Sequence, residues 1–406
     1  MKRESFGSRL GFILVSAGCA IGIGNVWKFP YICGAYGGAA FILIYLLFLI
    51  ILGIPVLVCE FAVGRGSRKS VALSFDELQS KNGKWTPLKF IGIIGCYMLM
   101  MFYTTVGGWL MYYCYKGIRG SFVNASSDNI STQFSQMLTD VPTMLFWTIL
   151  ICVIGFAVCM FGLNNGIERV TKVMMTALIL IMVVLAIRSV TMAGAGEGIS
   201  FYLIPDFHKM VESGIGNVVF AALSQAFFTL SIGIGAMLIF GSYLDQSRSL
   251  TGEAVNIMLL DTFVALTAGF IIIPACFAYG IEPGAGPSLI FITLPNIFAQ
   301  MSGGRIWAFL FFLFLTFAAL STIIAVFENL VMFNMELLGW RRKKSVLVCA
   351  ALIIILSIPC VLGFNVWSGV QLLGEGSTIM DLEDFIVSNN LLPLGSLGYV
   401  LFCTRK

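Results

Sequence analysis

Charge and catalytic side chains are scarce in this chain of 406 residues. Charged residues make up 11% of it, and histidine occurs once. The eleven cysteines include no Cys-x-x-Cys pair, and almost all of them fall within apolar stretches. This arrangement argues against a metal or redox centre and against a disulfide framework. Because the apolar stretches offer no Cys–His or Ser–His pair for nucleophilic catalysis, we do not expect an enzyme and assign no catalytic residue.

The chain is rich in long runs of apolar residues. Apolar residues make up 59% of it, and the mean hydropathy is +0.96. Runs of about 20 such residues can cross the hydrocarbon core of a bilayer, which is roughly 30 Å thick. We predict one all-α transmembrane domain, residues 1–406. Its ten expected spans are 11–33, 39–63, 89–115, 143–161, 168–190, 217–240, 254–280, 305–334, 345–363 and 382–402.

The positive charges predict an orientation. With the N-terminus in the cytoplasm, six of the 24 Lys and Arg residues lie outside: Lys28, Lys116, Arg119, Arg188, Lys209 and Arg305. The positive-inside rule favours this placement. We therefore expect an integral protein of the plasma (cell inner) membrane with a cytoplasmic N-terminus. The longer outer connections, 116–142 and 191–216, are expected to be polar loops.

The first span carries residues that interrupt a helix. Its stretch 18–30 contains three glycines, an asparagine and a proline. In a helix interior a glycine costs about 1 kcal/mol relative to alanine, and a proline roughly 3 kcal/mol. Within a membrane, broken backbone is tolerated only where it is buried in protein or lines a cavity. We expect the helix to open near 22–25 and to leave carbonyl oxygens free to bind a cation.

The same interruption occurs twice. The sequence Ile-Gly-Ile-Gly stands at 21–24 in the first span and again at 232–235 in the sixth. These spans begin two halves of five spans each, 1–190 and 217–402, and an odd number of spans makes the halves insert in opposite orientations. Interrupted helices at matching positions of inverted halves indicate a transport site at the middle of the membrane. The alternative is close helix packing through small residues.

Two further features are polar groups inside spans. Asp261 lies in the seventh span, and since no Lys or Arg lies in the middle of any span, a bound cation is its natural partner. The alternative is a protonated or hydrogen-bonded structural aspartate. In the eighth span Ser321 and Thr322 either face the first span or bond back to their own helix.

Four stretches together resemble the neurotransmitter:sodium symporter family, in particular its bacterial amino-acid transporter branch with the leucine-transporter-like fold. They are Gly-Ile-Gly-Asn-Val-Trp-Lys-Phe-Pro-Tyr at 22–31, Phe-Thr-Leu-Ser-Ile-Gly at 228–233, Phe-Ile-Thr-Leu-Pro at 291–295 and Gly-Ile-Glu-Arg at 166–169. The resemblance runs from about Arg3 to the C-terminus. It implies ten helices arranged as a 5+5 inverted repeat, with helices 1 and 6 unwound at mid-membrane.

The resemblance also implies ligands for two sodium ions. The first ion would bind the Ala20 carbonyl, Asn25, Thr229, Asp261 and the substrate carboxylate. The second would bind the carbonyls of Gly18, Ile21 and Ala318 and the hydroxyls of Ser321 and Thr322.

An amino-acid substrate would lie between the two broken helices. Its carboxylate would meet the Gly24 amide and the Tyr103 hydroxyl, and its ammonium the carbonyls of Ala20, Phe228, Thr229 and Ser231. Its side chain would lie among Leu99, Tyr103, Phe228, Ile234, Thr322 and Val326. Leu99 alone is equally typical of an ordinary packing residue. Because these walls are apolar, they favour a hydrophobic or aromatic amino acid.

The family's gates map onto charged pairs. Outside, Lys28 would face Asp384, with Tyr103 and Phe228 as a lid over the substrate. Inside, Arg3, Tyr243 and Glu336 would close the path, with Phe6 packed beneath them. Exposed ion pairs are worth only about 0–1 kcal/mol, which suits contacts that open in each cycle. Glu60 is expected to accept amides from the break in the sixth span, and Glu328 to have a structural role.

The sequence departs from the family pattern in three ways, which concern the outer gate, the chloride requirement and the number of spans. Lys28 replaces the usual arginine and loses its bidentate fork. Asp261 stands where many relatives have asparagine, and Val264 and Ala265 replace polar residues that help to bind chloride. We therefore expect no chloride requirement. Relatives usually have eleven or twelve spans; here both repeats are complete in ten, so the transport core is expected to be present.

These observations predict a sodium-coupled symporter that imports a neutral amino acid by alternating access. The alternatives are a proton-coupled permease with Asp261 titrating, an amino-acid sensor that does not transport, and a gated channel. The expected cofactor is Na⁺, two ions. The expected partners are a small-molecule amino acid and the lipid bilayer, with no nucleic acid, and the oligomeric state is left open.

Overall fold

The computed structural model describes residues 5–280 and 288–405, and all regular secondary structure within them is helical. Eight helices of this described part are long and apolar enough to cross a membrane, and a bent pair near the N-terminus makes a ninth. A tenth span is divided into α12 (Ile215–Thr229) and α13 (Ala236–Tyr243). The prediction of an all-α membrane protein with ten spans is confirmed.

The ten spans follow the predicted order, and several of them consist of more than one helical segment. In the first half they are α1 (Arg9–Ala20) with η1 (Gly24–Lys28) and α2 (Phe29–Ala35), α3 (Ala39–Phe48) with η2 (Leu49–Gly53) and α4 (Ile54–Ser67), α6 (Leu88–Arg119), α8 (Val141–Met160), and η3 (Leu163–Glu168) with α9 (Arg169–Val190). In the second half they are α12 with α13, α14 (Leu250–Ala278), α16 (Gly304–Leu338), α17 (Arg342–Leu362), and α18 (Ile379–Ile386) with η5 (Val387–Leu391) and α19 (Leu392–Arg405). The bounds of the two repeats, 1–190 and 217–402, stay a prediction.

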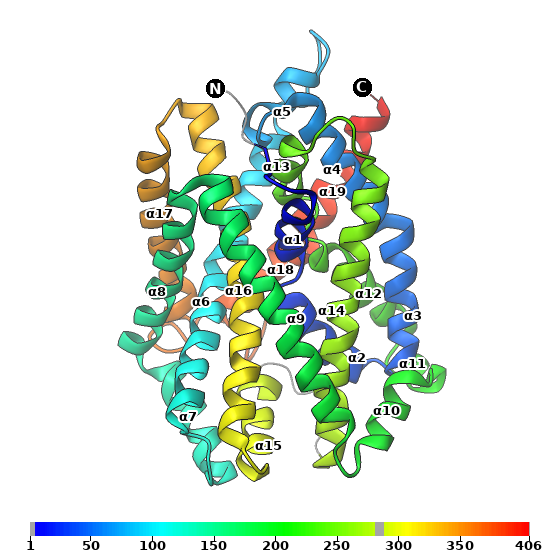
Figure 1. Ribbon diagram of the computed structural model, residues 1–406, viewed down its shortest axis with the longest axis vertical. Helices are drawn as coiled ribbons and strands as arrows, with labels where there is room; N and C mark the ends of the chain where they lie inside the picture. The colour runs from blue at the N-terminus through cyan, green and yellow to red at the C-terminus, as the bar shows by residue number, and fades with distance from the viewer. Residues whose placement is uncertain (1–4, 281–287, 406) are drawn as a thin grey trace.

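The prediction of polar loops at 116–142 and 191–216 was wrong. The first connection contains α7 (Ser127–Thr139), and the second contains α10 (Ala195–Leu203) and α11 (Phe207–Glu212). These helices are short and are held by tertiary contacts. The Tyr202 hydroxyl donates to the Leu266 carbonyl at 2.9 Å, and the ring of Phe134 stacks on that of Phe291. Figure 1 shows α7, α10 and α11 near the end of the bundle opposite α5 (Val71–Leu78) and the chain termini.

Both predicted interruptions are present. The first helix ends at Ala20 and resumes at Gly24 with a bend of 56°. The sixth span is non-helical between α12 and α13, where Ser231, Gly233 and Gly235 have φ angles of 51°, 95° and 73°. Positive φ is routinely accessible to glycine and strained for other residues, so the second and fourth residues of Ile-Gly-Ile-Gly fix this break. Hydrogen bonds join the first break to α6 and α16 and the second break to α6.

Candidate functional site

The two breaks contact each other, and polar side chains cover their exposed peptide groups. The Ser231 hydroxyl donates to the Cys19 carbonyl at 3.0 Å, and the Gln225 amide donates to the Gly24 carbonyl at 2.8 Å. Glu60 of α4 is fully buried and accepts hydrogen bonds from the backbone amides of Gly233 and Leu238. Bonds to a carboxylate are stronger than neutral ones, so Glu60 stabilises the break in the sixth span as the sequence predicts.

One polar cluster joins the first, sixth and seventh spans. The side-chain amide nitrogen of Asn25 donates to the Thr229 hydroxyl at 2.9 Å and to the Asp261 carboxylate at 2.7 Å. The Thr229 hydroxyl donates to the other carboxylate oxygen of Asp261 at 3.0 Å. All three residues are completely buried. Since these donors to Asp261 are neutral, any negative charge on the carboxylate stays uncompensated, and a cation would complement it.

Ala20 completes the predicted set of ligands for the first ion. It is the last residue of α1, and carbonyl groups in the last turn of a helix lack partners within that helix. Ala20 also lines the small cavity described below. Of the four predicted protein ligands, Ala20 and Asn25 thus belong to the interrupted first span, and Thr229 and Asp261 to the sixth and seventh spans.

A second cluster joins α1 and α16 through oxygen atoms alone. The Thr322 hydroxyl lies 3.3 Å from the Gly18 carbonyl oxygen and 3.4 Å from that of Ile21. The Ser321 hydroxyl lies 3.4 Å from the Ile21 carbonyl oxygen and 2.9 Å from that of Ala318. The two hydroxyls thus face the first span and also bond back to their own helix. Three carbonyls and two hydroxyls form the kind of oxygen set that a hard cation prefers.

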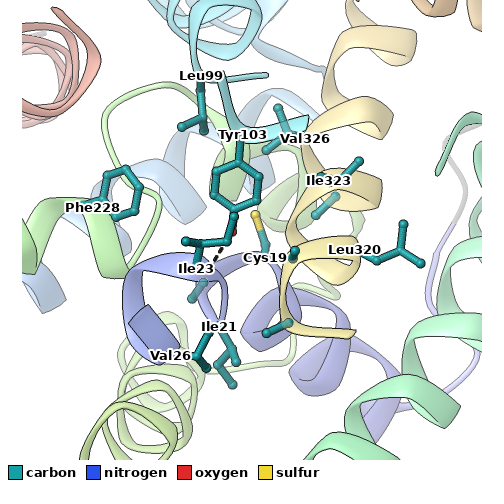
Figure 2. Packing of buried hydrophobic residues seen from close by; sticks show 14 of the residues in the cluster. Cys19, Ile21, Ile23, Val26, Leu99, Tyr103, Phe228, Leu320, Ile323 and Val326 are labelled. Carbon is teal, nitrogen blue, oxygen red and sulfur yellow. Dashed lines mark hydrogen bonds between the residues drawn. The ribbon is translucent and has the colours of Figure 1, made fainter. Parts of the chain in front are cut away.

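A small cavity of about 10 Å³ lies at the two breaks and is lined by residues of the first, third, sixth, eighth and tenth spans. Most residues predicted to hold the substrate line it, whereas Thr229 and Val326 do not. Sequence reasoning missed two residues of the lining, Gly22 and Leu392. The lining consists of Ala20, Gly22, Gly24, Leu99, Tyr103, Phe228, Ser231, Ile234, Thr322 and Leu392. Figure 2 shows Leu99, Tyr103, Phe228 and Val326 around the broken first helix, with the Tyr103 hydroxyl bonded to the Ile23 amide.

A larger cavity of about 230 Å³ is lined by Tyr103 and Phe228, and an ion pair borders it. The Lys28 ammonium donates to both carboxylate oxygens of Asp384, at 2.8 and 3.0 Å, and lies 4.5 Å from the centroid of the Phe228 ring. The predicted outer pair is therefore formed. It is partly exposed, and its two residues belong to distant parts of the chain.

At the predicted inner gate, Tyr243 and Glu336 make contacts that the sequence did not predict. The Tyr243 hydroxyl donates to Glu328 at 3.2 Å, and Arg342 forms a bidentate pair with Glu328 at 2.8 and 3.0 Å. Glu336 accepts bonds from the amide and hydroxyl of Ser70 at the start of α5. Glu336 follows Glu328 by eight residues on α16, which is about 12 Å along the helix.

The remaining members of the predicted inner gate are Arg3 and Phe6. Arg3 lies outside the described residues. Phe6 packs edge-on against Tyr243, with 5.8 Å between the ring centroids, as expected. Arg342 had no predicted role; the signal for it was the charge of Glu328 in an apolar run, which requires a nearby cation.

A helical bundle with two interrupted spans around a central cavity is the architecture of a secondary transporter. The family model of the sodium:neurotransmitter symporter family matches residues 3–133 and 122–374, and the chain belongs to this family. It is therefore an integral membrane transporter of the sodium-dependent kind, and not an enzyme.

Individual relatives agree with this assignment. An uncharacterised sodium-dependent transporter of Bacillus subtilis is 36% identical over 405 residues, which cover 100% of this chain and 88% of the relative. The sodium-dependent serotonin transporter of Drosophila melanogaster is 30% identical over 88% of this chain and 64% of its own length. A crystal structure of MhsT in complex with L-phenylalanine has a TM-score of 0.91 and 37% identity, covering 99% of this chain and 90% of MhsT.

Proposed function

We propose that the protein imports a neutral, hydrophobic or aromatic amino acid together with sodium ions by alternating access. The observation that carries this proposal is a cavity lined by residues of both helix breaks, together with two oxygen-rich clusters that include residues of the interrupted spans. The ends of half-helices carry partial charges of opposite sign. A zwitterion in the cavity places its carboxylate near the Gly24 amide and the Tyr103 hydroxyl. Its ammonium then meets carbonyls of Ala20, Phe228, Thr229 and Ser231.

Two sodium ions fit the two clusters. The first would bind Ala20, Asn25, Thr229, Asp261 and the substrate carboxylate; the second would bind Gly18, Ile21, Ala318, Ser321 and Thr322. Each ion gains roughly 2.3 kcal/mol across 100 mV and about 1.4 kcal/mol from a tenfold gradient. Two ions thus supply about 7 kcal/mol. Because the substrate carboxylate is itself an ion ligand, sodium and amino acid each strengthen the binding of the other.

The residues around Asp261 support transport without chloride. Val264 and Ala265 follow it on α14 and are fully buried and apolar, so they offer no side-chain donor to an anion. The Asp261 carboxylate supplies a fixed negative charge beside the first ion, which is the charge that a bound chloride would otherwise supply.

The walls of the cavity support the substrate class. Leu99, Ile234, Phe228 and Leu392 provide apolar surface, and the relative MhsT was crystallised with L-phenylalanine. An amino acid with a charged side chain would lose hydration there without a partner. We therefore propose phenylalanine, leucine and similar amino acids as substrates.

We also propose that the protein lies in the plasma membrane with a cytoplasmic N-terminus. The distribution of Lys and Arg favours this orientation, because it leaves few of them on the outer side. It places α5 and the Arg342–Glu328 pair on the cytoplasmic side, and the Lys28–Asp384 pair on the outer side.

One alternative remains, a permease driven by protons. It is favoured by the complete burial of Asp261 next to the neutral side chains of Asn25 and Thr229, since burial disfavours the charged form of a carboxyl group. Uptake that follows pH and ignores sodium would favour the permease over the symporter.

The test is uptake of labelled L-phenylalanine into proteoliposomes with an inward gradient of either sodium or potassium. We expect accumulation with sodium alone, and its loss in Asp261→Ala. The matched control is Asp128→Ala, an exposed aspartate of α7, which is expected to behave as the wild type. Equal accumulation with potassium in the wild type and in Asp261→Ala would contradict the assignment of the cation.

A further inference from the structure

The start of α19 packs backbone to backbone against the break in the sixth span. A Cβ atom added to Gly233 would overlap the carbonyl oxygen of Leu392, and one added to Gly395 would overlap the carbonyl oxygen of Gly233. The two segments therefore approach as closely as peptide groups allow. Any shift of the break toward α19 is blocked by backbone atoms, which cannot turn aside as a flexible side chain can.

Ile234 stands in the middle of this break and is held from the other side by α6. A Cβ atom added to Gly95 would lie 2.5 Å from Cγ2 of Ile234, which is far inside van der Waals contact. The thiol of Cys96 also donates to the Ile234 carbonyl at 3.4 Å. Ile234 is completely buried. It is thus fixed between α6 and α19 and has little room to withdraw from the cavity.

The cavity is small enough for this restraint to matter. Its volume of about 10 Å³ is close to the space that one water molecule needs. An amino-acid side chain enters only as far as its walls yield. Ile234 and Leu392 both line it, and both are fixed by the contacts described above.

We propose that Leu392, together with Ile234 as positioned by Gly95, sets the largest amino-acid side chain that the protein accepts. This inference rests on the proposed function. It adds Leu392 of α19 to the residues that are proposed to contact the substrate side chain. Leu392 and Gly95 are specificity-determining residues of different kinds. Leu392 bounds the cavity itself, whereas Gly95 acts through Ile234 and is a positioning residue.

The two residues are expected to shift selectivity in opposite directions. Leu392→Ala removes three carbon atoms from the wall and favours larger substrates. Gly95→Ala pushes Ile234 toward the cavity and favours smaller ones. A change of one methylene in a hydrophobic pocket alters discrimination by about tenfold or more. We expect the ratio of tryptophan affinity to valine affinity to rise about tenfold in Leu392→Ala and to fall about tenfold in Gly95→Ala.

Two control variants separate this effect from general disturbance. Leu394→Ala changes the same residue type on the same helix at a position that is 57% exposed. Gly216→Ala adds a methyl group where nothing lies within 4 Å. Both are expected to keep the wild-type ratio. Adding Ile234→Ala to Gly95→Ala removes the displaced side chain, so the double variant is expected to regain acceptance of tryptophan.

The measurement is equilibrium competition in detergent, in the presence of sodium, with valine, leucine and tryptophan displacing labelled L-phenylalanine. The ratio of tryptophan affinity to valine affinity does not depend on the yield of purified protein. Leu392→Val is the substitute variant if Leu392→Ala folds poorly. Opposite shifts in Leu392→Ala and Gly95→Ala support the inference. Wild-type ratios in both variants, or a Gly95→Ala shift that Ile234→Ala does not reverse, overturn it. Absence of binding of any of these amino acids to the wild type contradicts the proposed function as well.

Discussion

The side-chain amide of Asn25 donates to the carboxylate of Asp261 at 2.7 Å and joins the interrupted first helix to the seventh span. Asn25 lies just after the point where α1 stops, so its backbone and side chain both take part in the break. The same amide donates to Thr229 at the end of α12. This relationship ties both interrupted spans to one buried carboxylate, and a change of charge there affects both.

The charge of Asp261 gives the first prediction. Asp261→Asn keeps the size of the side chain and removes its fixed negative charge. We expect sodium-driven uptake to weaken in chloride-free medium and to recover at least partly when chloride is added, because an anion can then supply the missing charge. The comparison is phenylalanine uptake in chloride and in gluconate. Identical uptake in the two media by Asp261→Asn would contradict the proposed role of this charge.

The second cluster gives a prediction about sodium affinity. Thr322→Val removes the hydroxyl that lies near the Gly18 and Ile21 carbonyls while nearly preserving shape. We expect the sodium concentration for half-maximal phenylalanine binding to rise about tenfold, which corresponds to about 1.4 kcal/mol. Thr316→Val is the matched control, since the Thr316 hydroxyl donates only to the Phe312 carbonyl of its own helix among the described bonds. An unchanged sodium titration in Thr322→Val would remove this residue from the ion site.

Glu60 gives a prediction about stability. In the wild type each carboxylate oxygen of Glu60 accepts one backbone amide, from Gly233 or Leu238. Glu60→Gln replaces one of these oxygens with an NH₂ group, which cannot accept a hydrogen bond. Hydrogen bonds to charged groups contribute about 1.5–3 kcal/mol each, so we expect a loss of about 2 kcal/mol or more. The measurement is the melting temperature in detergent. Glu77→Gln, an exposed position on α5, is the control, and equal melting of the two variants would contradict the account of Glu60.

The outer ion pair predicts an effect on rates more than on stability. Lys28 and Asp384 are partly exposed, with side-chain exposures of 26% and 35%. Such pairs contribute roughly 0–1 kcal/mol. Lys28→Arg restores a bidentate fork and is expected to slow the dissociation of bound phenylalanine several-fold, whereas Lys28→Ala is expected to speed it. The dissociation rate after dilution into unlabelled ligand measures both. Equal rates in all three proteins would show that the pair does not act as a gate.

A pH effect is expected at the N-terminal end of α6, where Asp76 of α5 meets Lys89. Partial burial tends to raise the pKa of Asp76, but hydrogen bonds from Thr86 and Lys89 outweigh it, and the net pKa is lowered from 3.8. A lowered folded-state pKa means that the stabilisation is present above about 3.8 and is lost as the pH falls further. Because Asp76 is largely exposed, we expect Asp76→Asn to cost less than about 1 kcal/mol near neutral pH. The difference in melting temperature between wild type and variant is expected to shrink as the pH falls below 3.8; a constant difference would contradict the assignment.

Much of the fold follows from local sequence. The ten spans follow from apolar runs, and the breaks follow from glycines whose positive φ values other residues avoid. The short helices α7 and α10 escaped prediction because contacts such as Phe134 with Phe291 and Tyr202 with Leu266 hold them, and these contacts join residues far apart in the chain.

The site was predictable where a side chain has an evident chemical need. Asp261 requires partners in an apolar span, and the structure supplies Asn25 and Thr229. Leu392 carries no such signal, since its place at the cavity depends on how α19 packs against a break some 160 positions earlier. The hydrogen bond of Tyr243 to Glu328 likewise depends on the depth at which two helices meet.

The central claim is that sodium and the amino acid bind as one unit at the two breaks. Equilibrium binding of labelled L-phenylalanine to the wild type, measured over a series of sodium concentrations, tests it most directly. We predict that phenylalanine affinity rises at least tenfold between sodium-free and saturating conditions, and that phenylalanine tightens sodium binding by the same factor. Phenylalanine affinity that stays constant over the whole series would contradict the account.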